Sequence, residues 1–123
     1  MAGLANLRGF DADATLAAFG HQLAQVSGTM QAHTEGSVVL PLQIGLNARA
    51  AMQSCDLAQA GFPSLQAPLT GKFGYLTLFE TDWDLERAMD DLTERPKIAE
   101  LSHKPYPSGR ATHGGIEGLT VLR

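Results

Sequence analysis

The sequence predicts a mainly α-helical fold, and three observations support this prediction. In three separate segments, apolar residues recur at spacings of three and four, which is the pattern of one face of a helix. Each segment starts near a residue type that favours a helix N-terminus and is followed by a glycine or a proline. A short strand is predicted over residues 97–103 alone, where the sequence alternates.

The composition is that of a globular domain, and it narrows the possible partners. Of the 123 residues, 44% are hydrophobic and 18% charged, so the chain is long enough for one domain with a core. Its net charge of −4 does not favour binding to nucleic acid. No apolar run approaches the ~20 residues of a membrane span, and acids lie where a signal peptide needs an apolar core. We therefore expect a cytoplasmic protein with no nucleic-acid or membrane partner.

The first helix is predicted over residues 13–27. Its apolar stripe consists of Leu16, Phe19, Leu23, Val26 and Met30. Asp11 or Asp13 can cap the start, and Gly28 can end the helix. His21 lies off the stripe, which indicates a histidine on the surface.

The second helix is predicted over residues 42–60, with Pro41 in its first turn and Gly61 at its C-terminal cap. Its contact face consists of Ile44, Ala48, Ala51, Cys55 and Ala58. Small side chains let another helix approach closely, so we expect this helix to be deeply packed. For Cys55, the only cysteine, a buried thiol is favoured over a nucleophile.

The third helix is predicted over residues 82–92, with Thr81 or Asp82 as its N-cap and Pro96 as its stop. Before it, residues 73–79 fit either a helix or a strand, and we favour a helix. A last helix is predicted to start near residue 112. An unpaired strand and an abrupt end of the sequence predict a piece of a longer protein.

The segment "KPYPSGRATHGG", residues 104–115, combines cations with a histidine. Its two prolines favour an extended backbone, and turn-forming residues follow, so His113 is predicted at or just inside a helix N-terminus. Such a terminus, with Lys104 and Arg110 nearby, favours a carboxylate or phosphate. The alternative is an ordinary connection with solvated cations.

Three stretches of the chain resemble the central part of the MmgE/PrpD family. They are "MQAHTEGSVVLPLQIGLNARAAMQSCDLAQAGF", "LTGKFGYLTLFE" and "KPYPSGRATHGGIEGL". The family includes 2-methylcitrate dehydratase, cis-aconitate decarboxylase and iminodisuccinate epimerase. Its members have a large all-helical domain joined to a smaller α+β domain, are usually homodimers, and act on small di- and tricarboxylates without a metal.

This resemblance implies a fragment of the all-helical domain that runs into the start of the α+β domain. Residues 1–96 would be the C-terminal part of the helical domain. Residues 97–123 would be the crossing strand and the first helix of the incomplete α+β domain. The full-length form would be a homodimer, and its partner would be a small polycarboxylate substrate.

The resemblance also implies roles for individual residues. His113 matches the histidine of the family's "ATH" motif, and Lys104 matches the lysine that precedes it, so both are candidate catalytic residues. Imidazole suits proton transfer near neutrality. The candidate substrate-binding residues are Arg110, Ser108, Thr112 and His33. For His33, a loop histidine bonded to a backbone carbonyl is the alternative.

Other features limit the chemistry. The decarboxylase branch carries a lysine and a histidine in "KPLHIG", where this chain has Leu40 and Gln43, a departure that argues against decarboxylation of cis-aconitate. The histidines lack the ligand spacing of a zinc site, so we expect no metal, and the resemblance implies that there is no cofactor. The predicted function is that of a cofactor-independent lyase of the dehydratase type, using general acid/base catalysis. The alternatives are an isomerase or epimerase of the same family and a catalytically silent, truncated module or subunit.

Overall fold

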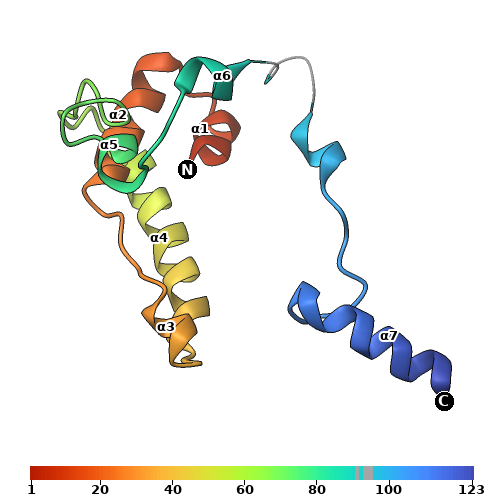
Figure 1. Ribbon diagram of the computed structural model, residues 1–123. Helices are drawn as coiled ribbons and strands as arrows, with labels where there is room; N and C mark the ends of the chain where they lie inside the picture. The colour runs from red at the N-terminus through yellow and green to blue at the C-terminus, as the bar shows by residue number, and fades with distance from the viewer. Residues whose placement is uncertain (91, 93–95) are drawn as a thin grey trace. The chain divides into compact units, whose positions relative to one another are not determined.

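The computed structural model describes residues 1–90, 92 and 96–123, which belong to two compact units (Figure 1). The N-terminal unit is Met1–Trp83 and the C-terminal unit is Asp84–Arg123. Regular structure in the described residues consists of α-helices and short 3-10 helices, without a strand. The predicted mainly α-helical fold is therefore confirmed.

The N-terminal unit contains five helices. They are α1 (Ala2–Leu7), α2 (Ala12–Leu23), α3 (Gln31–Thr34), α4 (Val39–Gln59) and α5 (Tyr75–Phe79). The two long predicted helices correspond to α2 and α4, and the helix favoured over residues 73–79 corresponds to α5. Helices α1 and α3 were not predicted, because six and four residues are too few for a periodic pattern.

The start of α2 follows from its capping residue, whereas its predicted end at residue 27 is wrong, because α2 ends at Leu23, before Gly28. The Asp11 carboxylate accepts a hydrogen bond from the Ala14 backbone N–H at 2.8 Å, which confirms one of the two predicted caps. Helix α4 starts three residues earlier than predicted, so Pro41 is its third residue. That position needs no backbone N–H, because the first N–H groups of a helix have no partner within it.

The core of the N-terminal unit lies where α1, α2 and α4 meet, and it consists of small side chains. Ala5, Ala18 and Cys55, one from each helix, are fully buried. Small residues at the contact allow helices to approach closely, but only part of the predicted contact face of α4 takes part, because Cys55 is buried whereas Ile44 and Ala48 are exposed. The Cys55 side chain is a free buried thiol, which confirms the prediction.

A buried polar network joins α2 to α4 next to this core. Ser54 is fully buried, and its hydroxyl donates to the Ala50 carbonyl at 2.8 Å. The Gln25 side-chain amide donates both to the Ser54 hydroxyl and to the His21 carbonyl, each at 3.1 Å. The buried Ser54 hydroxyl thus both donates and accepts, and the network links α2 to α4 by hydrogen bonds.

The C-terminal unit contains α6 (Leu85–Met89), the 3-10 helices η1 (Lys97–Glu100) and η2 (Arg110–Thr112), and α7 (His113–Leu122). Helix α6 starts later than predicted because the Asp84 carboxylate is its cap, accepting from the Arg87 N–H at 3.0 Å. At Asp90 the backbone becomes extended, with ψ 136°, and α6 ends. Residue 91 of the predicted helix lies outside the described residues.

The strand predicted over residues 97–103 is wrong. Residues Lys97–Glu100 form η1, and Leu101 continues in an extended conformation. A strand requires a neighbouring strand to satisfy its backbone groups, and the described residues contain none. A local 3-10 turn satisfies part of the backbone instead, with the Leu101 N–H donating to the Ile98 carbonyl at 3.2 Å.

Large apolar side chains are exposed along α4, as expected for faces shaped to pack in a larger body. Leu42, Ile44 and Met52 are each more than half exposed. These three side chains, which lie on different sides of α4, are therefore largely uncovered in the described N-terminal unit. No helix in the described parts of the chain combines the length and apolarity needed to cross a membrane.

Candidate functional site

The candidate site lies in residues 104–113 of the C-terminal unit. Pro105 and Pro107 restrict φ and keep the backbone out of a helix. The Ser108 N–H then donates to the Tyr106 carbonyl at 2.8 Å, which forms a tight turn. The 3-10 turn η2 then leads into α7, whose first residue is His113. The predicted place of His113 at a helix start is confirmed.

Lys104 and His113 meet at the same backbone oxygen. The carbonyl of Ser108 lies 3.4 Å from Lys104 Nζ and 3.3 Å from His113 Nε2. The Lys104 side chain is exposed, whereas His113 is half-buried. The two candidate catalytic residues therefore lie together, each near the same backbone oxygen.

The hydroxyl groups of Ser108 and Thr112 form a short chain of hydrogen bonds. Thr112 Oγ1 donates to the Gly109 carbonyl at 2.8 Å and lies 2.8 Å from Ser108 Oγ. Because a hydroxyl has one hydrogen, Ser108 must be the donor to Thr112. A bound carboxylate would have to compete for these hydrogens.

The predicted backbone donors at the start of α7 are partly in use. The Thr112 N–H donates to the Gly109 carbonyl at 3.0 Å, and the His113 N–H donates to the Arg110 carbonyl. The Arg110 guanidinium donates to the Ser102 hydroxyl, and its side chain is exposed. Cationic side chains are therefore better placed than these two N–H groups to bind an anion.

The segment is locally cationic and borders an open hollow of about 570 Å³. Lys104 and Ser108 are among the residues that line the hollow, whereas His113 is not. Residues 101–116 include Lys104 and Arg110 but no aspartate or glutamate, so their side chains contribute a local charge of +2. A hollow of this size and charge suits a small anionic ligand.

His33 lies apart from the other candidates in the chain, in α3 of the N-terminal unit, and its side chain is exposed. The nearby Glu35 carboxylate accepts a hydrogen bond from the Gln31 side-chain amide at 2.5 Å. The structure thus joins Lys104, Ser108, Arg110, Thr112 and His113 in one segment of the C-terminal unit, whereas His33 belongs to the N-terminal unit.

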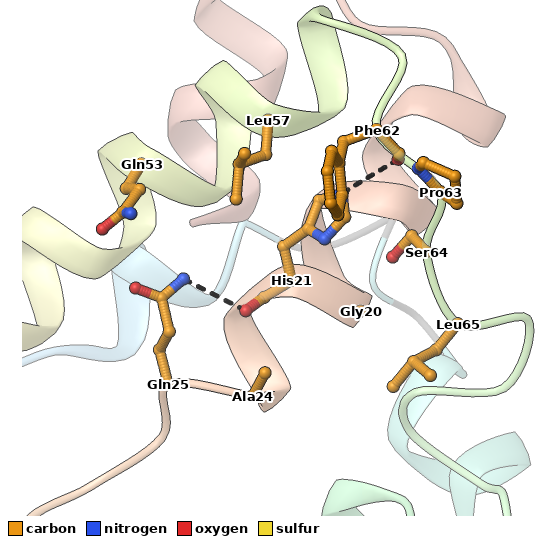
Figure 2. Close-up of a pocket in the computed structure, with 10 residues that line it drawn as sticks. All are labelled: Gly20, His21, Ala24, Gln25, Gln53, Leu57, Phe62, Pro63, Ser64 and Leu65. Carbon is orange, nitrogen blue, oxygen red and sulfur yellow. Dashed lines mark hydrogen bonds between the residues drawn. The ribbon is translucent and has the colours of Figure 1, made fainter.

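A second hollow, of about 600 Å³, lies in the N-terminal unit beside His21 (Figure 2). It is lined by α2, by the last turns of α4 and by residues 62–65, and Figure 2 shows His21 and Phe62 facing each other. His21 Nε2 lies 3.2 Å from the Phe62 carbonyl oxygen, and the two rings meet edge to face at 5.8 Å.

The prediction of a surface position for His21 is wrong, because only 9% of this residue is exposed. The chain turns back over α2 after Gly61, whose φ is +72° and suits glycine. His21 and Phe62 are 41 residues apart, so helical periodicity could not place them together. Gly20 was a local signal in the sequence that could have indicated this contact, because the absence of a side chain there lets residues 64 and 65 approach α2.

Clusters of three or more histidine, cysteine or acidic side chains able to hold a metal ion are absent from the described part of the chain. In comparisons with known proteins, the family model of the MmgE/PrpD N-terminal domain matches residues 1–88. No curated protein and no solved structure matches the chain significantly.

Proposed function

Because the chain belongs to the MmgE/PrpD family, we propose that it forms part of a cofactor-independent lyase of the dehydratase type that acts on a small di- or tricarboxylate. One observation supports the proposal most. The Lys104 ammonium and the His113 imidazole lie at one carbonyl oxygen, that of Ser108, in a locally cationic segment. A proton-transfer group beside a cation suits the removal of a proton next to a carboxylate.

In the proposed reaction, the neutral imidazole of His113 takes a proton from a carbon next to a substrate carboxylate. The electron pair of that C–H bond forms the new C=C bond, and the hydroxyl group on the neighbouring carbon leaves as water with the proton that the His113 imidazolium returns. Lys104 and Arg110 bind substrate carboxylates and stabilise the developing negative charge. Ser108 and Thr112 contribute hydroxyl groups, and His33 stays a sequence-based prediction.

A panel of small acids tests the proposal in the whole protein. Loss of water from 2-methylcitrate or citrate, followed by absorbance of the C=C product, is the expected result. Inversion of iminodisuccinate without loss of water would identify an epimerase, which uses the same proton transfer. If neither these acids nor cis-aconitate is turned over, the result would favour a catalytically silent module. The 123-residue chain alone is expected to be inactive.

Replacement of Lys104 by alanine is expected to raise KM about tenfold and to change kcat less. A charge-assisted hydrogen bond contributes about 1.5 kcal/mol or more, and a cation that holds a carboxylate in both ground and transition states acts mainly on binding. Added salt should reproduce part of the effect, because the Lys104 side chain is exposed. Steady-state kinetics checks this, with Lys72→Ala as the control at an exposed lysine of the N-terminal unit. A lower kcat at constant KM would contradict this role.

In the whole protein, we expect residues 1–96 to end the helical domain and residues 97–123 to begin the α+β domain, in a cytoplasmic homodimer. The exposed apolar residues of α4 support a further partner surface. The 123-residue chain should therefore self-associate as its concentration rises, as measured by analytical ultracentrifugation. A compact monomer at high concentration would contradict this expectation.

A further inference from the structure

The contact with Ser108 determines which nitrogen of His113 is available for chemistry. A carbonyl oxygen only accepts hydrogen bonds, so His113 Nε2, at 3.3 Å from the Ser108 oxygen, must carry the hydrogen. The neutral ring then has its lone pair on Nδ1. Of the two ring nitrogens, Nδ1 is the one able to accept a proton from a substrate.

A second contact restrains the ring of His113. The Tyr106 ring meets it edge to face, with ring centres 5.4 Å apart and planes at 79°. Both side chains are half-buried, and Tyr106 stands between two prolines that limit its backbone. An edge-to-face pair contributes about 0.5–1.5 kcal/mol, enough to favour one ring orientation several-fold.

We propose that Tyr106 is a positioning residue that, together with the Ser108 carbonyl, holds His113 with Nδ1 as its proton-transfer atom. The inference rests on the function proposed above, because it assigns a proton-transfer role to His113. Tyr106 acts through its ring, since the contact with His113 is a ring contact. A phenylalanine at position 106 should therefore keep this positioning role, whereas an aliphatic residue there should lose it.

Long-range ¹H–¹⁵N NMR of His113 in the 123-residue chain tests the geometry without any activity. The expected spectrum shows a hydrogen on Nε2 and cross-relaxation between the His113 and Tyr106 rings. Tyr106→Phe should preserve both signals. Tyr106→Leu should abolish the cross-relaxation and move the His113 ring shifts towards those of a free peptide. Tyr75→Leu, which removes an aromatic pair with Phe79 in the N-terminal unit, is the matched control and should leave them unchanged.

The kinetic arm uses the whole protein. Tyr106→Leu should lower kcat about tenfold with less than a twofold change in KM, because a misplaced proton-transfer group loses rate rather than binding. Tyr106→Phe should keep the kcat of the unsubstituted protein. A hydrogen on Nδ1, or a Tyr106→Leu variant with unchanged ring shifts and kcat, would overturn the inference. Full activity of His113→Gln would instead overturn the proposed function, whatever the spectra of Tyr106 variants show.

Discussion

Replacing His113 by glutamine in the whole protein is expected to lower kcat by about 10²–10⁴-fold, the usual contribution of a positioned proton-transfer group. Glutamine can still donate its side-chain N–H to the Ser108 carbonyl, so the local fold should survive. It cannot accept a proton near neutral pH. KM should change much less, because the cations that bind the carboxylates stay in place.

Steady-state kinetics with the substrate that proves to be turned over checks this expectation. The matched control is His103→Gln, the same substitution at an exposed histidine directly before Lys104. It should leave kcat within about twofold, because His103 has no assigned part in the chemistry. If His113→Gln kept full activity, His113 would have no part in proton transfer and would only complete the start of α7.

Substitution of Gly20 by alanine is expected to destabilise the N-terminal unit by about 1–3 kcal/mol, the usual cost of overpacking. The added methyl group would overlap the Ser64 hydroxyl oxygen and lie 2.9 Å from the Leu65 backbone nitrogen. Residues 62–65 would have to move away from α2. That movement would weaken the hydrogen bond from Ser64 to the Ala17 carbonyl, now 2.7 Å long, and the bond between His21 and Phe62.

The matched control, Gly45→Ala, should have the opposite sign. Gly45 lies inside α4, and a methyl group there would meet no atom within 4 Å. Alanine is favoured over glycine in a helix by about 0.8–1.0 kcal/mol, so this variant should gain stability. Urea denaturation measures both changes. A Gly20→Ala variant as stable as Gly45→Ala would show that residues 62–65 do not pack closely on α2.

The long helices could be predicted from the sequence because their signals are local. The apolar stripe of α2 and the small-residue face of α4 each repeat over several turns, and Asp11 marks the start of α2. The strand over residues 97–103 was wrong because alternation alone does not supply a partner strand. The start of α6 was misplaced because Thr81, Asp82 and Asp84 are all capable caps, and the sequence does not show that Asp84 is the one that caps the helix.

The same distinction applies to the candidate site. Lys104, Ser108 and His113 lie within ten residues, so proline and turn chemistry sufficed to predict that they lie together. The hollow beside His21 could not be predicted, because it depends on a contact between residues 41 positions apart. The contact between Tyr106 and His113 is local, but sequence patterns do not give the angle between two rings.

The small side chains at the centre of the N-terminal unit have a thermodynamic consequence. Ala5, Ala18 and Cys55 remove little apolar surface from water when they are buried. The heat capacity change of unfolding scales with newly exposed apolar surface, and so does the slope of stability against denaturant. Both should be small for a chain of this length. We therefore expect a flat stability curve for this unit, with unfolding that spreads over a wide range of temperature instead of occurring as one sharp transition.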